Sequence, residues 1–257
     1  MNSVRNVLAI ADKELRSYFA SPIAYIIIGL FALIFGRFFD VYLAFFVQRS
    51  SGMGPMGGGS HNINQDMIRY LLMNSAVIIL FVMPMITMRT YAEEKRSGTI
   101  ELLLTSPLTD LQIILGKFLG AMGLYAAMLV VTLLHMGILF WYGDPEWRPI
   151  AAGYLGLILM GGCFISLGLL ISSFTKNQIV AGVITFAAFL MLWIISWNAD
   201  QSGPWMRAVL QHLSIIDHFD DFARGIIDTK HLVYYLSFIT FGLFLTAKSV
   251  DSERWRG

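Results

Sequence analysis

The sequence predicts an all-α integral membrane protein with six transmembrane helices. Apolar residues make up 56% of the 257 residues and charged residues only 14%, whereas about a quarter of the residues of a soluble domain are charged. The mean hydropathy is +0.66. The apolar residues gather in blocks of about 20, the length that an α-helix needs to cross a hydrocarbon core of about 30 Å. These observations argue against a soluble globular fold.

The first 21 residues predict an amphipathic helix. Apolar side chains recur at helical spacing on one face, at Val4, Val7, Leu8, Ala11, Leu15 and Tyr18. Such a helix can lie in the membrane interface or pack as a soluble helix on a partner. Ser21 and Pro22 then mark the start of the next helix, with Ser as the N-cap and Pro in the first turn.

We expect one transmembrane domain over residues 1–257. Its predicted spans are residues 22–46, 68–88, 111–141, 150–174, 178–197 and 231–250. A loop rich in Gly and Met, residues 48–66, joins the first two spans. Residues 198–230 are too polar and interrupted to span, and their helical periodicity predicts short re-entrant helices in the outer leaflet.

The distribution of Lys and Arg predicts the orientation. With six spans both termini share one side, which would hold eleven of the 18 Lys and Arg residues, against six on the other side and Arg37 within a span. Short loops rich in Lys and Arg stay in the cytoplasm. We therefore expect both termini on the cytoplasmic side of the membrane.

Charge concentrates on the loop between the second and third spans, residues 89–110. It reads as two short pieces hinged at Gly98, and Thr99 is placed to cap the second piece. Thr109 and Gln112 have the spacing of a capping box at the start of the third span. The loop is either a docking surface for a partner or a solvated hairpin that only anchors the topology.

The stretch "MRTYAEEKRSGTIELLLTSPLTDLQIILGKFLGA" in this region resembles the signature of ABC-2-type transporter permeases. Three further stretches, "SPIAYIIIGL", "NQIVAG" and "DDFARGIIDTKHLVYYLS", resemble more narrowly the permease subunit of the gliding-motility-associated Gld ABC transporter. The last stretch is also similar to the nitrous-oxide-reductase maturation permease. The resemblance covers nearly the whole chain, although residues 48–66 match no motif of the family.

The resemblance implies six spans, an N-terminal elbow helix in the interface, and a coupling helix that docks on a cytoplasmic ABC ATPase subunit. The implied docking residues are Tyr91, Glu93, Glu94, Lys95, Arg96, Gly98, Thr99, Glu101, Leu103 and Leu104. The three glutamates among them would face basic residues of the ATPase. The two leucines and Ile100 would pack in its apolar groove or on the spans.

No cofactor is expected on this chain. A P-loop needs Gly-Lys-Ser/Thr after a Gly-rich turn, whereas Lys117 of the one Gly-Lys pair is followed by Phe118. ATP and magnesium would therefore bind to the ATPase subunit. Six spans are too few to enclose a wide path, so the expected partners include a second copy or a paralogous permease. An accessory membrane protein with a periplasmic domain and the lipid bilayer are further partners, and the net charge of +1 gives no indication of nucleic acid.

Other classes of function stay open. The permease could transmit ATPase-driven motion to a periplasmic partner without transporting a substrate. A channel or structural anchor is a second alternative, and an intramembrane enzyme is a remote third. Glu93 and Glu94 suggest the Glu-Glu-x-x-x-Arg motif of some membrane proteases, but Gly98 stands where that motif needs Arg.

A few charged residues inside or near the predicted spans are candidate functional residues, because a charge in the bilayer is costly. Arg37 and Asp40 lie three residues apart on one helix face, where they can pair. They would contact a substrate headgroup or the partner permease, or extend to the outer interface. A second group could line an outer gate, meet an accessory protein or cap the bundle, namely Asp217, Asp220, Asp221 and Arg224.

Overall fold

The computed structural model describes residues 3–51, 62–104, 107–197, 199–201 and 203–254, and every regular element within these ranges is helical. The elements are α1 (Ser3–Ala20), α2 (Pro22–Ser50), the π-helix η1 (Asn64–Ile68), α3 (Arg69–Thr87), α4 (Ala92–Ser97), α5 (Thr99–Leu104), α6 (Asp110–Tyr142), α7 (Trp147–Ser173), α8 (Gln178–Ile194), the 3-10 helix η2 (Ala199–Gln201), α9 (Pro204–Leu213), α10 (Ile215–Ala223) and α11 (Thr229–Arg254).

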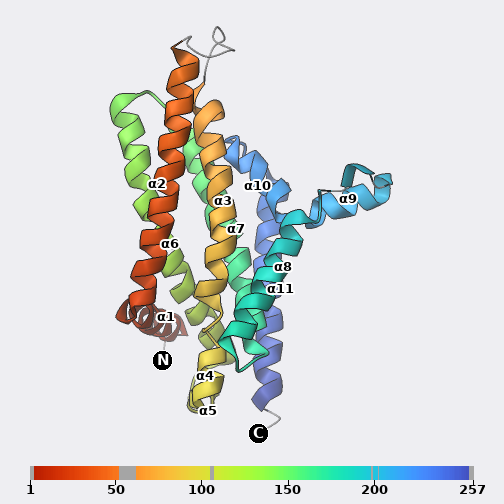
Figure 1. Cartoon of the computed structure of the whole chain (residues 1–257). Helices are drawn as coiled ribbons and strands as arrows, with labels where there is room; N and C mark the ends of the chain where they lie inside the picture. Colours follow the sequence, from red (N-terminus) through yellow and green to blue (C-terminus); the bar gives the residue numbers. More distant parts are fainter. Residues whose placement is uncertain (1–2, 52–61, 105–106, 198, 202, 255–257) are drawn as a thin grey trace.

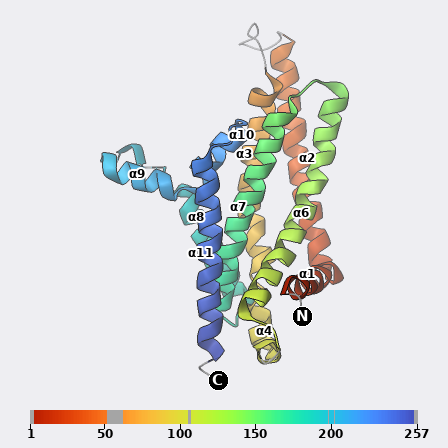
Figure 2. The same ribbon diagram turned by 180° about the vertical axis from the view of Figure 1, so that it is seen from behind.

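The long helices run side by side along one axis and form a bundle with two different ends (Figure 1). At one end α1 lies across the bundle, close to α4 and α5, and we call this the α4 end. At the other end α10 leans against α3 and α7, and α9 projects sideways from the bundle; we call this the α10 end. The view from behind shows α11, α7 and α6 as neighbours along the bundle (Figure 2).

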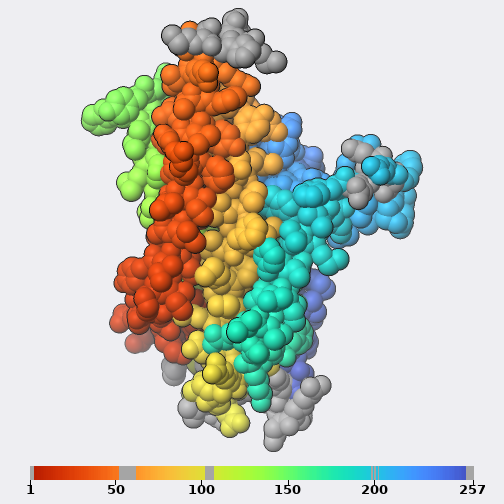
Figure 3. All heavy atoms as spheres, in the orientation of Figure 1, coloured from red at the N-terminus to blue at the C-terminus, as the bar shows by residue number. Residues whose placement is uncertain are grey.

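Helices α3 and α7 form the core of the bundle. The most apolar window of the candidate span that contains α3 is 67% buried and that of α7 is 72% buried, against 28% for α2 and 22% for α11. The peripheral helices therefore keep a large apolar surface. On the face shown in Figure 3, α2 and α8 flank α3, and both expose large apolar side chains such as Leu33 and Ile179.

Glycines in α7 let its neighbours approach closely. A Cβ atom on Gly161 would lie 2.1 Å from the ring of Tyr125, and one on Gly168 would lie 2.3 Å from Oγ1 of Thr87. Small residues at such contacts are how helices pack within a membrane, where the hydrophobic effect does not drive them together.

Five helical segments are long and apolar enough to cross a membrane by length and composition: Pro22–Ser50, Asn64–Ser97, Asp110–Tyr142, Trp147–Ser173 and Thr229–Ser252. Helix α8 is also apolar and lies against α3 and α7. It has 17 residues, about 26 Å at 1.5 Å per residue, which is short for a full crossing. The count of six spans therefore stays a prediction.

The predicted helix starts are confirmed where they depend on local chemistry. Ser21 caps α2 through Ile23 N, Pro22 is its first residue, and Thr109 and Gln112 form the predicted capping box of α6. Leu8, on the predicted apolar face of α1, is 57% exposed, as a residue that faces lipid or a partner would be. Ile10, which was not assigned to that face, is buried against α6.

Candidate functional site

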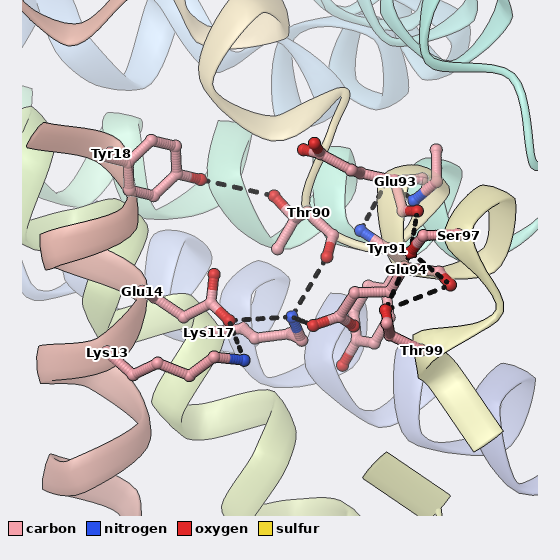
Figure 4. Close-up of polar contacts among 12 residues, drawn as sticks. Lys13, Glu14, Tyr18, Thr90, Tyr91, Glu93, Glu94, Ser97, Thr99 and Lys117 are labelled. Carbon is pink, nitrogen blue, oxygen red and sulfur yellow. Dashed lines mark hydrogen bonds and ion pairs between the residues drawn. The ribbon is translucent and has the colours of Figure 1, made fainter. Parts of the chain in front are cut away.

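A buried lysine joins three elements at the α4 end of the bundle. Lys117 of α6 is 1% exposed, and its Nζ donates to Glu14 Oε1 of α1 at 3.0 Å, to Glu94 Oε1 of α4 at 2.7 Å and to the carbonyl of Thr90 at 3.1 Å (Figure 4). An ammonium has three donors, and all three are used. We call Glu14, Thr90, Glu94 and Lys117 the Lys117 junction.

The junction carries more negative than positive charge. The side chains of Glu14 and Glu94 are 13% and 16% exposed, so two carboxylates share one buried cation. Nζ of Lys13 lies 3.9 Å from Glu14 Oε1 and adds a weaker, exposed partner. The second oxygen of Glu94, Oε2, is buried and has no hydrogen-bond partner among the described residues. Removing one partner of such a buried pair is costly, because an uncompensated charge remains.

Two glycines of α6 bring α1 close enough for the junction to form. A Cβ atom on Gly116 would lie 2.5 Å from Cβ of Ile10, and one on Gly120 would lie 2.6 Å from Cβ of Glu14. The spacing of four residues puts both glycines on one face of α6. The backbone of α1 can therefore lie against α6, and Glu14 reaches Lys117 one turn away.

Tyr18 connects α1 to the end of α3 beside the junction. Its hydroxyl donates to the carbonyl of Ile86 at 3.0 Å and lies 3.5 Å from Oγ1 of Thr90. The guanidinium of Arg89 lies over its ring, 4.5 Å from the centroid. Burial raises the pKa of Tyr18, so the hydroxyl stays protonated and remains a donor at neutral pH.

Serines at the end of α7 hold α4 from the opposite side. Oγ of Ser172 accepts from the backbone N–H groups of Tyr91 and Ala92, both at 3.0 Å, and donates to the carbonyl of Met88 at 3.1 Å. It thus satisfies two of the N–H groups that a helix start leaves without partners. Nζ of Lys95 donates to the carbonyl of Ser173.

The contacts continue from α7 to the last helix. Oγ of Ser173 donates to Oγ of Ser249 on α11 at 2.7 Å. Helix α4 is therefore connected by polar contacts to α1, α6 and α7, and through α7 to α11. A displacement of α4 would act on all four helices.

The docking residues implied by the sequence divide into a buried and an exposed set. Tyr91 and Lys95 are 0% and 7% exposed, and Glu94 faces Lys117. These three were expected on a partner-facing surface and instead hold α4 to the bundle, because their side chains fall on the inner face of this helix. Gly98 has φ +73° and ends α4 as predicted. The exposed residues are Glu93, Arg96, Gly98, Thr99 and Glu101; the side chains of Leu103 and Leu104 lie outside the described residues.

A cleft of about 650 Å³ lies beside the junction between α1, α3, α4 and the start of α8. Its walls carry both signs of charge, from Lys13 and Arg89 and from Glu14, Glu93 and Glu94. The close-up shows the side chains of α1 and of residues 90–99 facing one another across this region (Figure 4). The cleft separates the exposed face of α4 from α1.

The charged residues predicted at the α10 end do not line one gate. Asp220 pairs with Arg69 of α3 at 2.7 Å and with Arg224 at 2.5 Å, whereas Asp221 faces α11, where it contacts His231 at 2.7 Å. Asp217 is exposed. The predicted group therefore lies on different faces of α10.

Arg37 and Asp40 pair on α2 as expected, at 2.6 Å, but their side chains are 72% and 68% exposed. The pair contacts no other charged side chain that the structure describes. It is thus a surface feature of this chain, unlike the charges of the Lys117 junction.

Sequence reasoning did not find Lys117, which it counted only as a charge that sets the topology. A signal was present, because a lone lysine in an apolar helix, eight residues after an N-cap, must pair or reach water. The histidines at the α10 end, His218 and His231, were also missed. Among the described residues, no group of three or more His, Cys, Asp and Glu side chains is arranged to hold a metal ion.

These features define a multi-pass helical membrane protein in which a short charged segment is anchored to one end of the bundle. The model of the ABC-2 family transporter proteins matches residues 47–210, more than half of the chain. The chain therefore belongs to the ABC-2 family, whose members are transporter permeases.

Known relatives extend this assignment. The chain is 31% identical over 156 residues to "Probable multidrug ABC transporter permease YbhR" of Escherichia coli (strain K12), and equally to the protein of that name from Escherichia coli O157:H7. The match covers 59% of this chain and 41% of each relative. The chain thus matches less than half of the length of these relatives.

Proposed function

We propose that this chain is the membrane-spanning permease subunit of a bacterial ABC-2 transporter in the inner membrane. In this proposal it couples ATP hydrolysis by a separate ATPase subunit to export of a substrate, or to its extraction from the membrane. The carrying observation is that α4 has one side held to the bundle, while its other side and the start of α5 are exposed. One side exposes Glu93, Arg96, Thr99 and Glu101, and the other side is tied to the bundle.

The exposed side is suited to docking. Charged side chains there are solvated in the free chain and can pair with a partner, which favours specific and rapid association. Gly98 separates the two short helices and permits the sharp angle between them, because its left-handed conformation is easy only for glycine. We propose that α4 and α5 together are the coupling helix.

The buried side is suited to transmitting motion. The Lys117 junction connects α4 to α1 and α6, and Ser172 connects it to α7. Breaking a buried ion pair costs about 3–5 kcal/mol, so displacing α4 alone is unfavourable. A movement imposed by the closing ATPase would instead move the attached helices.

The assembly follows from the family. ABC-2 permeases generally work with a cytoplasmic ATPase and as dimers, and the exposed apolar faces of α2 and α8 (Figure 3) fit a second permease or lipid. We propose six crossings, α8 included, with both termini on the cytoplasmic side and α1 as the elbow helix. The narrower similarity to the gliding-motility type adds an accessory membrane protein as a proposed partner.

The printed name of the relatives suggests a class of substrate for this chain. YbhR is named as a multidrug permease, and export of amphipathic small molecules is accordingly a candidate activity for this chain. Transmission of motion to a periplasmic partner is a second candidate, favoured by α9, which projects from the bundle and contains no buried residue. Neither activity requires a catalytic group on this chain.

Co-purification tests the proposal. The chain is expressed with its neighbouring genes and extracted in detergent, and the recovered subunits are counted. We expect an ABC ATPase at one copy per permease, with hydrolysis that depends on the permease. Recovery of the chain alone, as a single species without ATPase, would contradict the proposal and favour a topology anchor.

A further inference from the structure

At the α10 end, two buried imidazoles form an unbroken chain of contacts between α10 and α11. Nδ1 of His218 lies 2.6 Å from Nδ1 of His231, whose Nε2 lies 2.7 Å from Oδ2 of Asp221. Nε2 of His218 lies 3.0 Å from the carbonyl oxygen of His212. The two rings are 7% and 4% exposed. We call these four groups the histidine strap.

The number of protons in the strap follows from the hydrogen bonds that its three contacts require. A peptide carbonyl can only accept, so the contact to His212 requires a proton on Nε2 of His218. The Nδ1–Nδ1 contact requires one proton between the rings, and the contact to Asp221 requires one more. The three contacts therefore need three protons, whereas an ionised Asp and two neutral imidazoles carry only two.

With three protons bound, the strap has no net charge. With an ionised carboxylate on Asp221, His231 is an imidazolium and His218 is neutral with its proton on Nε2. With the proton moved to the carboxylate, all three groups are neutral and the same contacts are made. A chain of this kind is favourable in a buried site because no charge is left uncompensated.

We propose that the histidine strap is a proton-binding site that fastens α10 to α11 only while it holds three protons. Removing one proton leaves two acceptors facing each other at one contact. Adding a proton to an imidazole places two N–H groups face to face across the Nδ1–Nδ1 contact. The strap therefore loosens on both sides of its working pH. This proposal does not depend on transport or on an ATPase.

The groups around the strap are few and come from every element that packs on it. Helix α9 contributes the ring of His212, 5.6 Å from that of His218, and α10 contributes Asp217. Helix α11 contributes Lys230, 3.9 Å from Asp221, and Tyr234, whose ring stacks on His218 with centroids 3.8 Å apart.

The remaining charged and titratable neighbours lie further along the chain or on other helices. Asp228, before α11, pairs with Lys230 at 3.2 Å. On α3, Arg69 is engaged by Asp220, and on α7 the thiol of Cys163 donates to the carbonyl of Tyr235. Helix α8 has no titratable residue. The charged groups nearest to the strap are therefore Lys230, Asp217 and Asp228.

Water can reach the strap from outside the bundle. A cleft of about 450 Å³ is lined by Gln211, Asp217, Asp221 and Lys230 together with the two rings. Protons can therefore exchange with the solution on this side. Burial lowers the pKa of His218, which agrees with a neutral ring beside an imidazolium.

Other contacts of α10 remain when the strap opens, among them the ion pair of Asp220 with Arg69 of α3. Hydroxyls of Tyr234 and Tyr235 donate to the carbonyls of Leu213 and Ile215 at 3.0 and 2.9 Å. Opening therefore loosens the contact between α10 and α11 at His218 and Asp221, while α10 stays packed on α3 and α7. Opening removes a charge-assisted hydrogen bond, so we expect amide exchange in residues 218–223 to become about tenfold faster.

The first test reads the protonation directly. The full chain, labelled with ¹⁵N-histidine and held in lipid nanodiscs, is examined by long-range ¹H–¹⁵N correlation from acid to alkaline pH. Near neutral pH we expect one imidazolium, assigned to His231, and one Nε2–H tautomer, assigned to His218. Two neutral rings that titrate independently would overturn the proposal.

The second test measures how firmly α10 is held to α11. Amide exchange in residues 218–223 is compared at several pH values for the natural chain, His218→Gln, His231→Gln and the matched control His212→Gln, which keeps the backbone carbonyl. For the ratio of the observed to the intrinsic exchange rate, we expect a minimum near the working pH in the natural chain and the control. In the other two proteins we expect a ratio about tenfold higher that does not change with pH. The same profile in all four proteins would overturn the proposal. If a variant fails to fold, the titration of the natural chain decides alone.

Discussion

The two ends of the bundle are both held by buried polar contacts, but the chemistry differs. At the α4 end, a lysine ammonium lies between two carboxylates, groups that ordinarily titrate near 10.4 and 4.3. At the α10 end, two imidazoles share protons with Asp221, and imidazoles titrate near neutrality. The first connection is an ion pair of one cation with two carboxylates, whereas the second is the proton-dependent strap that we propose.

This difference suggests a division of labour. In the proposed function, α4 receives force from an ATPase and needs a connection that does not open. The Lys117 junction provides such a connection, which joins α4 to α1 and α6. The connection at the opposite end can depend on conditions such as pH, because it only joins α10 to α11. The predictions below separate the two ends, from the largest expected effect to the smallest.

Lys117→Met should have the largest effect. It leaves Glu14 and Glu94 buried without a cation, and we expect a loss of about 3–5 kcal/mol of unfolding free energy. Thermal unfolding in detergent measures the loss, and amide exchange should rise in α1 and α4 while α10 is unchanged. An unchanged melting temperature would show that the junction is not a buried ion pair.

A matched variant separates charge from size. Lys117→Met combined with Glu14→Gln and Glu94→Gln removes all three charges together. Replacing a whole buried ionic group is often neutral, so we expect most of the stability to return. Equal instability of the single and triple variants would assign the effect to packing instead.

Ser172→Ala should have a smaller effect at the same end. It leaves the N–H groups of Tyr91 and Ala92 without their acceptor, and unsatisfied buried groups cost about 1–3 kcal/mol. Chemical denaturation in detergent checks the value. Ser173→Ala, which loses the bond to Ser249, is the control and should cost less. The reverse order would contradict the assigned role of Ser172 in holding α4.

Acidification should weaken the α10 end. The pKa of His218 is lowered by burial, so its contribution to stability is full above the unfolded value of about 6.5 and is lost as pH falls through the folded pKa. We expect thermal stability to fall between about pH 7.5 and 5.5. His218→Gln should flatten this dependence, and a profile unchanged by that substitution would assign it to other groups.

The smallest effect is expected at the exposed pair on α2. Arg37→Gln removes an ion pair whose partners are 72% and 68% exposed, and such pairs contribute at most about 1 kcal/mol. Melting of this variant should match the natural chain, as should that of Asp40→Asn. A large loss would mean that α2 is covered by a partner at this point.

The sequence predicted those features of the fold that depend on local patterns. Apolar blocks gave the long helices, and Thr109 with Gln112 gave the start of α6, because both signals lie within a few residues. The split at Gly98 was equally local. The length of α8 was overestimated, because Ser196 and Trp197 are compatible with a helix but lie beyond its end at Ile194.

The site could be predicted only in part, because its chemistry joins distant segments. Glu14, Glu94 and Lys117 are separated by up to 103 residues, and no pattern in one segment shows that they meet. Glu94 looked like its exposed neighbour Glu93, since two adjacent glutamates differ only in which helix face they occupy. The same holds for Asp221, whose partner His231 lies on another helix.

The most direct test of the central claim uses the exposed face of α4 and α5. Glu93→Arg and Glu101→Arg are introduced together, with Arg148→Glu at the α10 end as the control, and each permease is purified with its ATPase. We predict an unchanged melting temperature in both, with loss of the bound ATPase only from the double variant. Retention of the ATPase at the natural ratio by the double variant would contradict docking on this segment.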